Sequence, residues 1–306
     1  MQNIKINDEN YPNMLCNIKN APKELYVEGK IDCCKLPCIT VVGSRNMTSY
    51  GKEMTQKIVK DLTLAGICIV SGLAIGIDSV AHQTCLENGG KTIAVLGSGL
   101  NKVFPKENIG LYKEIINSGG CVISEQEPDK EAEKIFFPAR NRIVSGLSLG
   151  TIVIEATYRS GTSITAKFAF EQGRKVFCLP NMVGNKNSSG TINLMKKGAI
   201  LITEANEILY ELGLISKLED VEELNEKNRK NKASIIENEE LSQLDELTKK
   251  VYLYVKENKI VNLEMMGEDL KINVQDLNVC LTILELKGLI VSKSGSSFTV
   301  RDELYG

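Results

Sequence analysis

Short, continuously apolar runs that alternate with helical patterns constrain the fold of this chain more than any other feature. Between residues 39 and 213 the apolar runs fall at 39–42, 67–70, 92–96, 121–124, 151–154, 175–179 and 199–202. Continuous hydrophobicity indicates strands that are buried on both faces. Between them, the stretches Lys52–Ala65, Ile164–Gln172 and Glu204–Leu212 place apolar side chains on one helical face. The pattern predicts a doubly wound, mainly parallel α/β sheet.

Five glycine- or serine-rich turns are predicted to lie at one edge of that sheet. Each comes after an apolar run, and they are Gly43-Ser44-Arg45, Ser71-Gly72, Gly97-Ser98-Gly99, Ser124-Glu125 and Ser160-Gly161-Thr162. Ligands of doubly wound sheets bind outside the carboxyl ends of the strands. A strand, a glycine turn and a helix in succession leave unpaired backbone N–H groups at a helix N-terminus, where a phosphate can bind without a dedicated lysine. We therefore expect a phosphate-containing ligand at this edge.

The run Phe137-Pro138-Ala139-Arg140-Asn141-Arg142 places two guanidinium groups and an aromatic ring within six residues. Because guanidinium groups bind phosphates and aromatic rings stack on bases, the run favours a nucleic-acid ligand. The 306-residue chain has a net charge of −2, but residues 1–214 carry 24 Lys and Arg against 21 Asp and Glu, a net charge of +3. Binding must therefore depend on a local groove and not on the overall field.

The cysteine and histidine content argues against a metal site and against nucleophilic catalysis. His82 is the only histidine, so a serine or cysteine nucleophile with a histidine base is hard to assemble. The nine cysteines are an odd number and several lie in apolar runs, which predicts reduced core thiols. Cys33, Cys34 and Cys38 lie close in sequence, but no second ligand pair matches them, so we expect no metal.

No apolar stretch approaches the roughly 20 residues that span a bilayer, and the first ten residues are polar. The sequence therefore predicts a cytoplasmic protein with no membrane partner.

The C-terminal residues 241–306 have a pattern of their own. Helical periodicity over Leu244–Val255, Leu263–Leu270 and Val274–Leu286 precedes two strand-like runs around Ser294-Gly295, and this order predicts a small winged-helix domain. Its candidate recognition helix is acidic, which favours a protein contact or a spacer role over duplex binding. Residues 215–240 have the mixed charge of a linker. Residues 39–214 would be the ligand-binding domain, and residues 1–38 an extension that packs on it.

Together these motifs resemble the DNA-processing protein A family (DprA, also called Smf), over residues 11–213 and again over the winged helix. The resemblance follows one order along the chain, through Tyr11-Pro12, Leu25-Tyr26, Val42-Gly43-Ser44-Arg45, Ser71-Gly72-Leu73-Ala74, Gly76-Ile77-Asp78, Phe104-Pro105-Lys106-Glu107-Asn108, Phe137-Pro138 with Arg140-Asn141-Arg142, Glu155-Ala156 and Ser160-Gly161-Thr162.

This resemblance implies an extended Rossmann domain that binds single-stranded DNA and forms a homodimer. It further implies protection of incoming strands and loading of a RecA-type recombinase in natural transformation and homologous recombination. It implies no enzymatic activity, no catalytic residue and no cofactor.

The resemblance also implies roles for individual positions in binding DNA. Arg45 and either Arg140 or Arg142 look like phosphate ligands, and Phe137 looks like a base-stacking ring. The full set of implied DNA-binding residues is Ser44, Arg45, Gly72, Lys106, Lys134, Phe137, Arg140, Asn141, Arg142, Gly161 and Thr162. Lys106 and Lys134 are supporting cations, while Ser44, Gly72, Gly161 and Thr162 supply backbone or hydroxyl donors.

Structural interpretations of the same residues stay open at this point. Arg142 can form an internal ion pair with Glu155 or Glu125, and Phe137 can belong to the core. Asp78 and His82 lie one helical turn apart, close enough for a side-chain contact, and we favour a structural or capping role for them.

Two other functions also remain open. One is a Rossmann-like nucleotide hydrolase, in which Glu155, ahead of the Ser160-Gly161-Thr162 turn, acts as an acid or base. The other is a nucleotide sensor whose output is the winged helix. Consumption of nucleoside monophosphates would identify the hydrolase, and equal binding of a mononucleotide and an oligonucleotide would identify the sensor.

Overall fold

The computed structural model describes residues 1–215, 244–258, 261–287, 289–293 and 297–300. They form two compact units. The predicted linker, residues 215–240, lies outside the described residues except for its first position.

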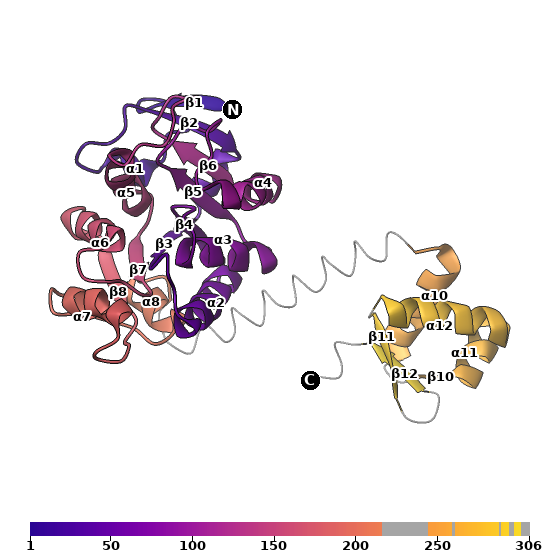
Figure 1. The fold of residues 1–306 in the computed structure, drawn as a ribbon. Coiled ribbons are helices and arrows are strands. Elements are labelled where there is room, and N and C mark those ends of the chain that lie inside the picture. The colour runs from indigo at the N-terminus through magenta and orange to yellow at the C-terminus, as the bar shows by residue number, and fades with distance from the viewer. Residues whose placement is uncertain (216–243, 259–260, 288, 294–296, 301–306) are drawn as a thin grey trace. The chain divides into compact units, whose positions relative to one another are not determined.

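The first unit is built on a sheet that has nine strands within the described residues, in the order β1-β2-β6-β5-β4-β3-β7-β8-β9 (Figure 1). The strands from β3 to β9 are mutually parallel and coincide with the seven predicted apolar runs. They are β3 (Cys38–Val42), β4 (Cys68–Ser71), β5 (Thr92–Leu96), β6 (Cys121–Ser124), β7 (Gly150–Val153), β8 (Lys175–Cys178) and β9 (Ile200–Leu201). The chain winds outward from β3 to β6 and then returns to β7 on the other side of β3, so the predicted doubly wound sheet is confirmed.

The N-terminal residues contribute two strands that the sequence pattern did not predict. β1 (Gln2–Lys5) pairs with β2 (Glu24–Gly29), and β2 pairs with β6, in both cases antiparallel. The short helix α1 (Asn13–Cys16) lies between β1 and β2, and the 3₁₀ helix η1 (Ile31–Lys35) lies between β2 and β3. The N-terminal extension is therefore one end of the same sheet.

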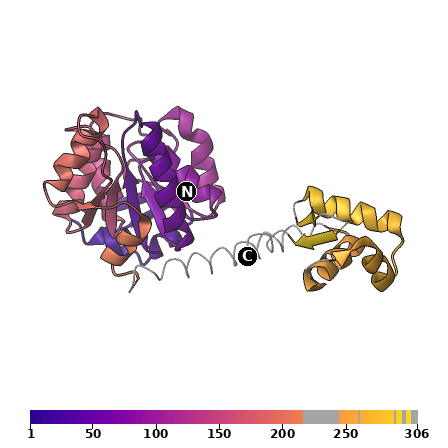
Figure 2. The ribbon, with the colours of Figure 1, turned by 90° about the horizontal axis from the view of Figure 1, so that it is seen from below.

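Helices cover both faces of the sheet (Figures 1 and 2). The alternating strand residues divide into two sets, one packed with Ile58, Leu62 and Ile208, the other with Leu15, Ile143 and Ala166. The first face carries α2 (Ser49–Leu64), α3 (Ile77–Glu87), α4 (Ile109–Asn117) and α8 (Ala205–Glu211). The second carries α1, α5 (Phe136–Gly146), α6 (Gly161–Glu171) and α7 (Ser189–Met195). Two further 3₁₀ helices, η2 (Lys106–Asn108) and η3 (Lys186–Ser188), lie in connecting segments.

The second unit has its own core. It contains α10 (Glu246–Asn258), α11 (Leu263–Leu270), α12 (Val274–Leu286) and a sheet ordered β10 (Val261–Asn262), β12 (Ser297–Val300), β11 (Ile290–Lys293). Val251, Tyr252, Leu281 and Leu284 are among its buried side chains. The predicted helices and the two predicted strands are present, while the turn around Ser294-Gly295 lies outside the described residues. The winged-helix assignment stays a prediction.

Seven of the nine cysteines are buried and none forms a disulfide, as expected of core thiols. Among the described residues, no helix combines the length and apolar composition needed to cross a bilayer.

Candidate functional site

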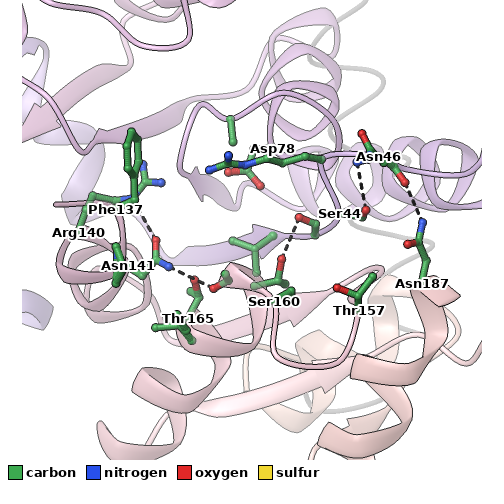
Figure 3. A pocket seen from close by; sticks show the side chains of 18 of the residues that line it. Ser44, Asn46, Asp78, Phe137, Arg140, Asn141, Thr157, Ser160, Thr165 and Asn187 are labelled. Carbon is green, nitrogen blue, oxygen red and sulfur yellow. Dashed lines mark hydrogen bonds between the residues drawn. The ribbon is translucent and has the colours of Figure 1, made fainter. Parts of the chain in front are cut away.

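A cavity of about 590 Å³ lies at the carboxyl edge of the sheet, between the segments that follow β3 and β7 (Figure 3). The winding direction of the chain reverses between these two strands, which is where doubly wound sheets bind their ligands. Seven of the predicted residues line it, namely Ser44, Arg45, Phe137, Arg140, Asn141, Gly161 and Thr162. A second cavity of about 200 Å³ shares Arg45, Phe137 and Arg140 with the first and adds Gly72 to its lining.

The N-terminus of α2 does not offer the phosphate site that its glycine turn suggested. Glu155 is fully buried, and its carboxylate accepts hydrogen bonds from the Thr48 backbone N–H at 3.0 Å and from the Thr48 hydroxyl. Thr48 is the N-cap of α2, and its hydroxyl in turn accepts from the Gly51 N–H at 3.0 Å. A Cβ at Gly51 would lie 2.5 Å from the Glu155 carboxyl carbon, so only glycine fits there. An internal carboxylate therefore already occupies this helix start.

The predicted glycine turn at the start of α6, unlike the N-terminus of α2, lines the cavity. The Ser160 hydroxyl caps the helix by accepting from the Ser163 N–H at 3.3 Å. Asn141 Nδ2 donates to the Gly161 carbonyl at 3.2 Å, and Thr162 Oγ1 donates to the Gly43 carbonyl at 2.9 Å. These bonds fix the positive end of α6 against α5 and the end of β3. An anion in the cavity would be stabilised by that helix end.

Arg140, on α5, is buried and bonded internally. Its Nη1 donates to the Gly72 carbonyl at 2.7 Å and to the Val95 carbonyl, and its Nε donates to Asn141 Oδ1 at 3.2 Å. Burial lowers its pKa to about 10, an effect that the nearby Asp78 carboxylate opposes. Arg140 still lines both cavities, but its guanidinium group donates hydrogen bonds to backbone carbonyls of β5 and of the turn after β4.

Asp78 and Gly72 complete this internal arrangement. Asp78 Oδ2 accepts from the Gly72 N–H at 3.1 Å, and burial raises the pKa of the Asp78 carboxyl above its ordinary value. A Cβ at Gly72 would lie 2.7 Å from Arg140 Nη2 and 2.8 Å from Asp78 Oδ2. Asp78 and Arg140 therefore hold the turn after β4 in place, which agrees with the structural role favoured for Asp78.

His82 does not contact Asp78 through any hydrogen bond in the described part of the chain. Its Nδ1 lies 2.6 Å from Thr92 Oγ1, and that hydroxyl donates to the Ile69 carbonyl at 2.7 Å. Since the hydroxyl hydrogen is directed to Ile69, Nδ1 carries the proton and Nε2 is a buried acceptor that has no partner among the described residues. Burial first, and then the charge of Arg140, lowers the pKa of His82 to about 3. The histidine is neutral and structural.

Arg142 lies outside the lining of both cavities. Its Nη1 donates to Glu125 Oε2 at 2.9 Å, its Nη2 pairs with the other Glu125 oxygen, and its Nε donates to the Asn20 carbonyl at 3.0 Å. Of the interpretations left open by the sequence, the structure has the internal ion pair with Glu125. We therefore leave Arg142 out of the candidate site.

Arg45 differs from both α5 arginines. Its side chain is exposed at the border of both cavities, and it has no hydrogen-bond or ion-pair partner within the described residues. The neighbouring Ser44 hydroxyl accepts from the Asn46 N–H at 3.1 Å and so shapes the loop after β3. Arg45 is thus a cation held near the cavity by a short loop and available to a ligand.

Phe137 lies in the first turn of α5, where Pro138 is tolerated because the N–H groups there lack helical partners. The Phe137 ring is half-buried, and its centroid lies 5.7 Å from that of Phe104 with the planes tilted by 57°. A Cβ at Gly97 would lie 3.0 Å from the Phe137 ring, so Gly97 leaves room for it. The ring borders both cavities, which is the position that base stacking requires.

The two remaining predicted cations lie outside the lining of both cavities. Lys106 begins η2, between Pro105 and Glu107, which do line the smaller cavity. Lys134 is exposed in the turn just before α5. Their supporting role stays a prediction.

Sequence reasoning missed a group of polar residues on the opposite side of the larger cavity. Lys186, in η3, is exposed and lines the cavity together with Asn46, Thr157 and Asn187. Asn187 Nδ2 donates to the Asn46 carbonyl at 2.8 Å, which joins the segment after β8 to the loop after β3 (Figure 3). The rule that ligands bind at the carboxyl ends of strands, applied to β8 as well, would have identified Lys186.

We call Phe137, Arg140 and Asn141 the α5 side of this site. The loop side is the set Arg45, Asn46, Lys186 and Asn187.

Comparison with known proteins identifies relatives of the first unit. The sequence profile of a family described as DNA recombination-mediator protein A matches residues 2–213. Protein Smf of Escherichia coli (strain K12) is 44% identical over 209 residues, which are 68% of this chain and 56% of that protein. The chain thus spans little more than half the length of this relative.

Two solved structures are similar to the same part of the chain. The X-ray structure of DNA processing protein A from Streptococcus pneumoniae has 42% identity and a TM-score of 0.65, and covers 69% of this chain and 74% of that one. The structure of DNA processing protein A from Helicobacter pylori has 31% identity and a TM-score of 0.62, and covers 69% and 96%. The latter work describes a single-stranded DNA binding mode of the Helicobacter pylori protein.

Proposed function

The chain belongs to the DNA recombination-mediator protein A family, and from this premise we propose that it binds single-stranded DNA in the two cavities at the carboxyl edge of its sheet. The observation that carries the proposal is Arg45, an exposed cation without a partner in the described residues, at the border of both cavities. Phe137 borders the same two cavities. A cation for the phosphate and a ring for the base are what binding of a single strand requires.

The site also has the dimensions of a mononucleotide pocket, since about 590 Å³ is within the range of small-molecule sites. A nucleotide hydrolase, however, needs an acid or base that can reach its substrate. Glu155, the residue proposed for that role, lines neither cavity, and its carboxylate is bound by Thr48. The geometry therefore favours binding over hydrolysis, and a binding protein without enzymatic activity is our proposal.

The direct test is fluorescence anisotropy of a labelled oligo-dT, its matched duplex and a labelled nucleoside monophosphate, over a series of salt concentrations. We expect tight binding of the oligonucleotide and weak binding of the other two ligands. Arg45→Ala should weaken oligonucleotide binding by roughly tenfold or more, because it removes a charged hydrogen-bond donor. It should also lower the slope of log affinity against log salt by about 0.7, the value for one phosphate contact on a single strand.

The outcomes separate the three functions. Equal affinity for the monophosphate and the oligonucleotide would favour the sensor, and consumption of the monophosphate would favour the hydrolase. Absence of binding at low salt by folded protein would refute the proposal. Because Arg45 is exposed, Arg45→Ala should leave the unfolding free energy within about 0.5 kcal/mol of the unmodified protein.

We further propose that the bound strand is protected from nucleases and delivered in the cytoplasm to a RecA-type recombinase, in natural transformation or homologous recombination. The family's description as a recombination mediator supports this. The assay is RecA-type ATPase activity on a strand covered with single-strand-binding protein. Addition of this chain should shorten the lag, whereas Arg45→Ala should not, because a mediator must hold the strand that it delivers.

We also propose that the chain acts as a homodimer. Exposed apolar side chains between residues 182 and 214 support this, with Val183 90% exposed, Met182 79% and Leu201 53%. Light scattering at several concentrations should give twice the mass of one chain. Leu201→Asp, with Leu36→Asp as the matched exposed control, should shift the equilibrium toward the monomer.

A further inference from the structure

Five cysteines gather at the amino-terminal edge of the parallel strands, opposite the candidate DNA site. Cys38, Cys68 and Cys121 are the first residues of β3, β4 and β6, and all three side chains belong to the same face of the sheet. Cys33 and Cys34 lie in η1. This helix contacts β5, the strand between β4 and β6. A sheet edge and a short helix thus bring together thiols that are far apart in sequence.

The sulfur atoms of Cys33, Cys34 and Cys121 all lie within 4.8 Å of one another, and the Cys33 and Cys121 sulfurs are 3.4 Å apart. Cys68 begins β4 on the same face of the sheet, but its sulfur is not within 4.8 Å of all three of these sulfurs. We call Cys33, Cys34 and Cys121 the thiol cluster.

These spacings suit a tetrahedral metal ion. Zn²⁺ binds thiolates at about 2.3 Å, which places two ligand sulfurs about 3.8 Å apart in a tetrahedral site. Two sulfurs of the thiol cluster are 3.4 Å apart and no two of its three are more than 4.8 Å apart, so their spacing is close to that of a tetrahedral thiolate site. The ligands are all sulfur, which selects a soft or borderline ion over Mg²⁺ or Ca²⁺.

A route for an ion also exists. Cys33, Cys68 and Cys121 are buried, but Cys34 is only half-buried and lines a separate cavity of about 380 Å³ together with Cys38 and Lys35. An ion can therefore reach the thiol cluster through Cys34 without unfolding of the sheet.

We propose that the thiol cluster is a structural zinc site, with Cys33, Cys34 and Cys121 as ligands and with Cys68, after a shift of its side chain, in the fourth position. Zn²⁺ displaces the thiol protons to solvent as it binds. The ion joins η1 to the first residues of β4 and β6, and so fastens the N-terminal extension to the parallel sheet. Sequence spacing could not show this, because it offered no second ligand pair for Cys33 and Cys34, and the other two ligands begin separate strands.

The test uses the full chain, purified with a phosphine reductant that keeps thiols reduced and does not itself bind zinc. Zinc content is measured by elemental mass spectrometry, and affinity by competition with a colorimetric chelator. We expect one Zn²⁺ per chain. Co²⁺ alone, added to the metal-free protein, should give the intense near-ultraviolet absorption of thiolate-to-cobalt charge transfer. Zinc at a hundredfold excess over its dissociation constant should raise the melting temperature by roughly 5–10 °C.

The decisive variant is Cys34→Ser, because a half-buried position tolerates serine without unfolding of the chain. It should lower zinc affinity by at least about 10- to 100-fold, the cost of losing even an outer partner of a metal ligand. Cys16→Ser, which changes an exposed thiol outside the thiol cluster, is the matched control and should retain the metal. Both variants should bind oligo-dT as the unmodified protein does, since neither residue lines the DNA site.

The proposal would be overturned if the purified protein contains no Zn²⁺ and the metal-free protein shows no charge-transfer absorption with Co²⁺. The cysteines would then be small apolar core residues. Equal zinc affinity in Cys34→Ser and Cys16→Ser would overturn it as well. Loss of DNA binding with the metal still present would refute the proposed function and leave the zinc site standing.

Discussion

On the α5 side of the cavity, the guanidinium group of Arg140 is buried and donates to the carbonyls of Gly72 and Val95. On the loop side, the guanidinium group of Arg45 is exposed and has no partner within the described residues. Both line the same cavities, but Nε and Nη1 of Arg140 are engaged by internal acceptors, whereas Arg45 donates to no acceptor within the described residues. We conclude that a cation beside a cavity is available to a ligand only where its donor groups are not already hydrogen-bonded within the fold. We expect Arg140 to contribute mainly to the stability of the fold, and the loop-side cations Arg45 and Lys186 to contribute mainly to the affinity for DNA.

The largest effect should come from Arg140→Met. Removal of one partner of a buried charged pair leaves the other uncompensated, and here Asp78 would remain buried opposite methionine. We expect the unfolding free energy to fall by about 3–5 kcal/mol, measured by urea denaturation. Asp78→Asn in the same chain should restore part of this loss.

This comparison between the two arginines would fail in one specific case. If Arg140→Met unfolds at the same urea concentration as the unmodified protein but no longer binds oligo-dT, then Arg140 is a phosphate ligand. The corresponding control is Arg45→Ala, which should show the opposite pattern.

Phe137→Ala should have the next largest effect, and on affinity. Loss of a stacking ring costs about 1–3 kcal/mol of binding free energy per base, and the salt dependence should stay unchanged because no charge is removed. The matched control is Phe136→Ala, since Phe136 lies beside it in α5, contacts Lys130 through its ring and lines neither cavity. A fall in thermal stability equal in both variants, with affinity unaltered, would assign Phe137 to the core.

The sequence predicted the sheet well because each parallel strand, buried on both faces, is a continuous apolar run. It predicted the position of the site for a related reason, since the carboxyl edge follows from strand order. It did not predict β1 and β2, whose mixed polar and apolar residues resemble those of loops. Nor could it decide between Arg140 and Arg45, because the partners of Arg140, the carbonyls of Gly72 and Val95, are 68 and 45 residues away.

The pH dependence of the unfolding free energy should show that buried His82, which lies close enough to Arg140 to feel its charge, contributes to stability. The folded-state pKa of His82 is about 3, against an ordinary value of 6.5, so the unfolded chain binds more protons between these pH values. Stability must therefore fall as the pH falls through this window. From pH 7 to pH 5.5 the loss from this one group is about 1.2 kcal/mol.

His82→Gln should remove this part of the pH dependence, measured as the difference between the two proteins in urea unfolding at pH 7 and 5.5. The difference matters because Asp78, whose pKa is raised by burial, contributes with the opposite sign in both proteins. If the two proteins lose equal stability over this interval, His82 is not the buried neutral group that the structure describes.

The smallest effect should come from Lys186→Ala, on the loop side. Lys186 is exposed, so one phosphate contact from it adds little affinity, roughly two- to fivefold at low salt. Its signature is instead the salt dependence, which should fall by about 0.7 in the slope of log affinity against log salt. Lys197→Ala is the control, because Lys197 is also exposed but lines neither cavity. Identical slopes for the two variants would mean that the bound strand does not reach η3. On the loop side, the bound DNA would then reach only as far as Arg45, and the remaining path for the strand would run along α5 past Phe137.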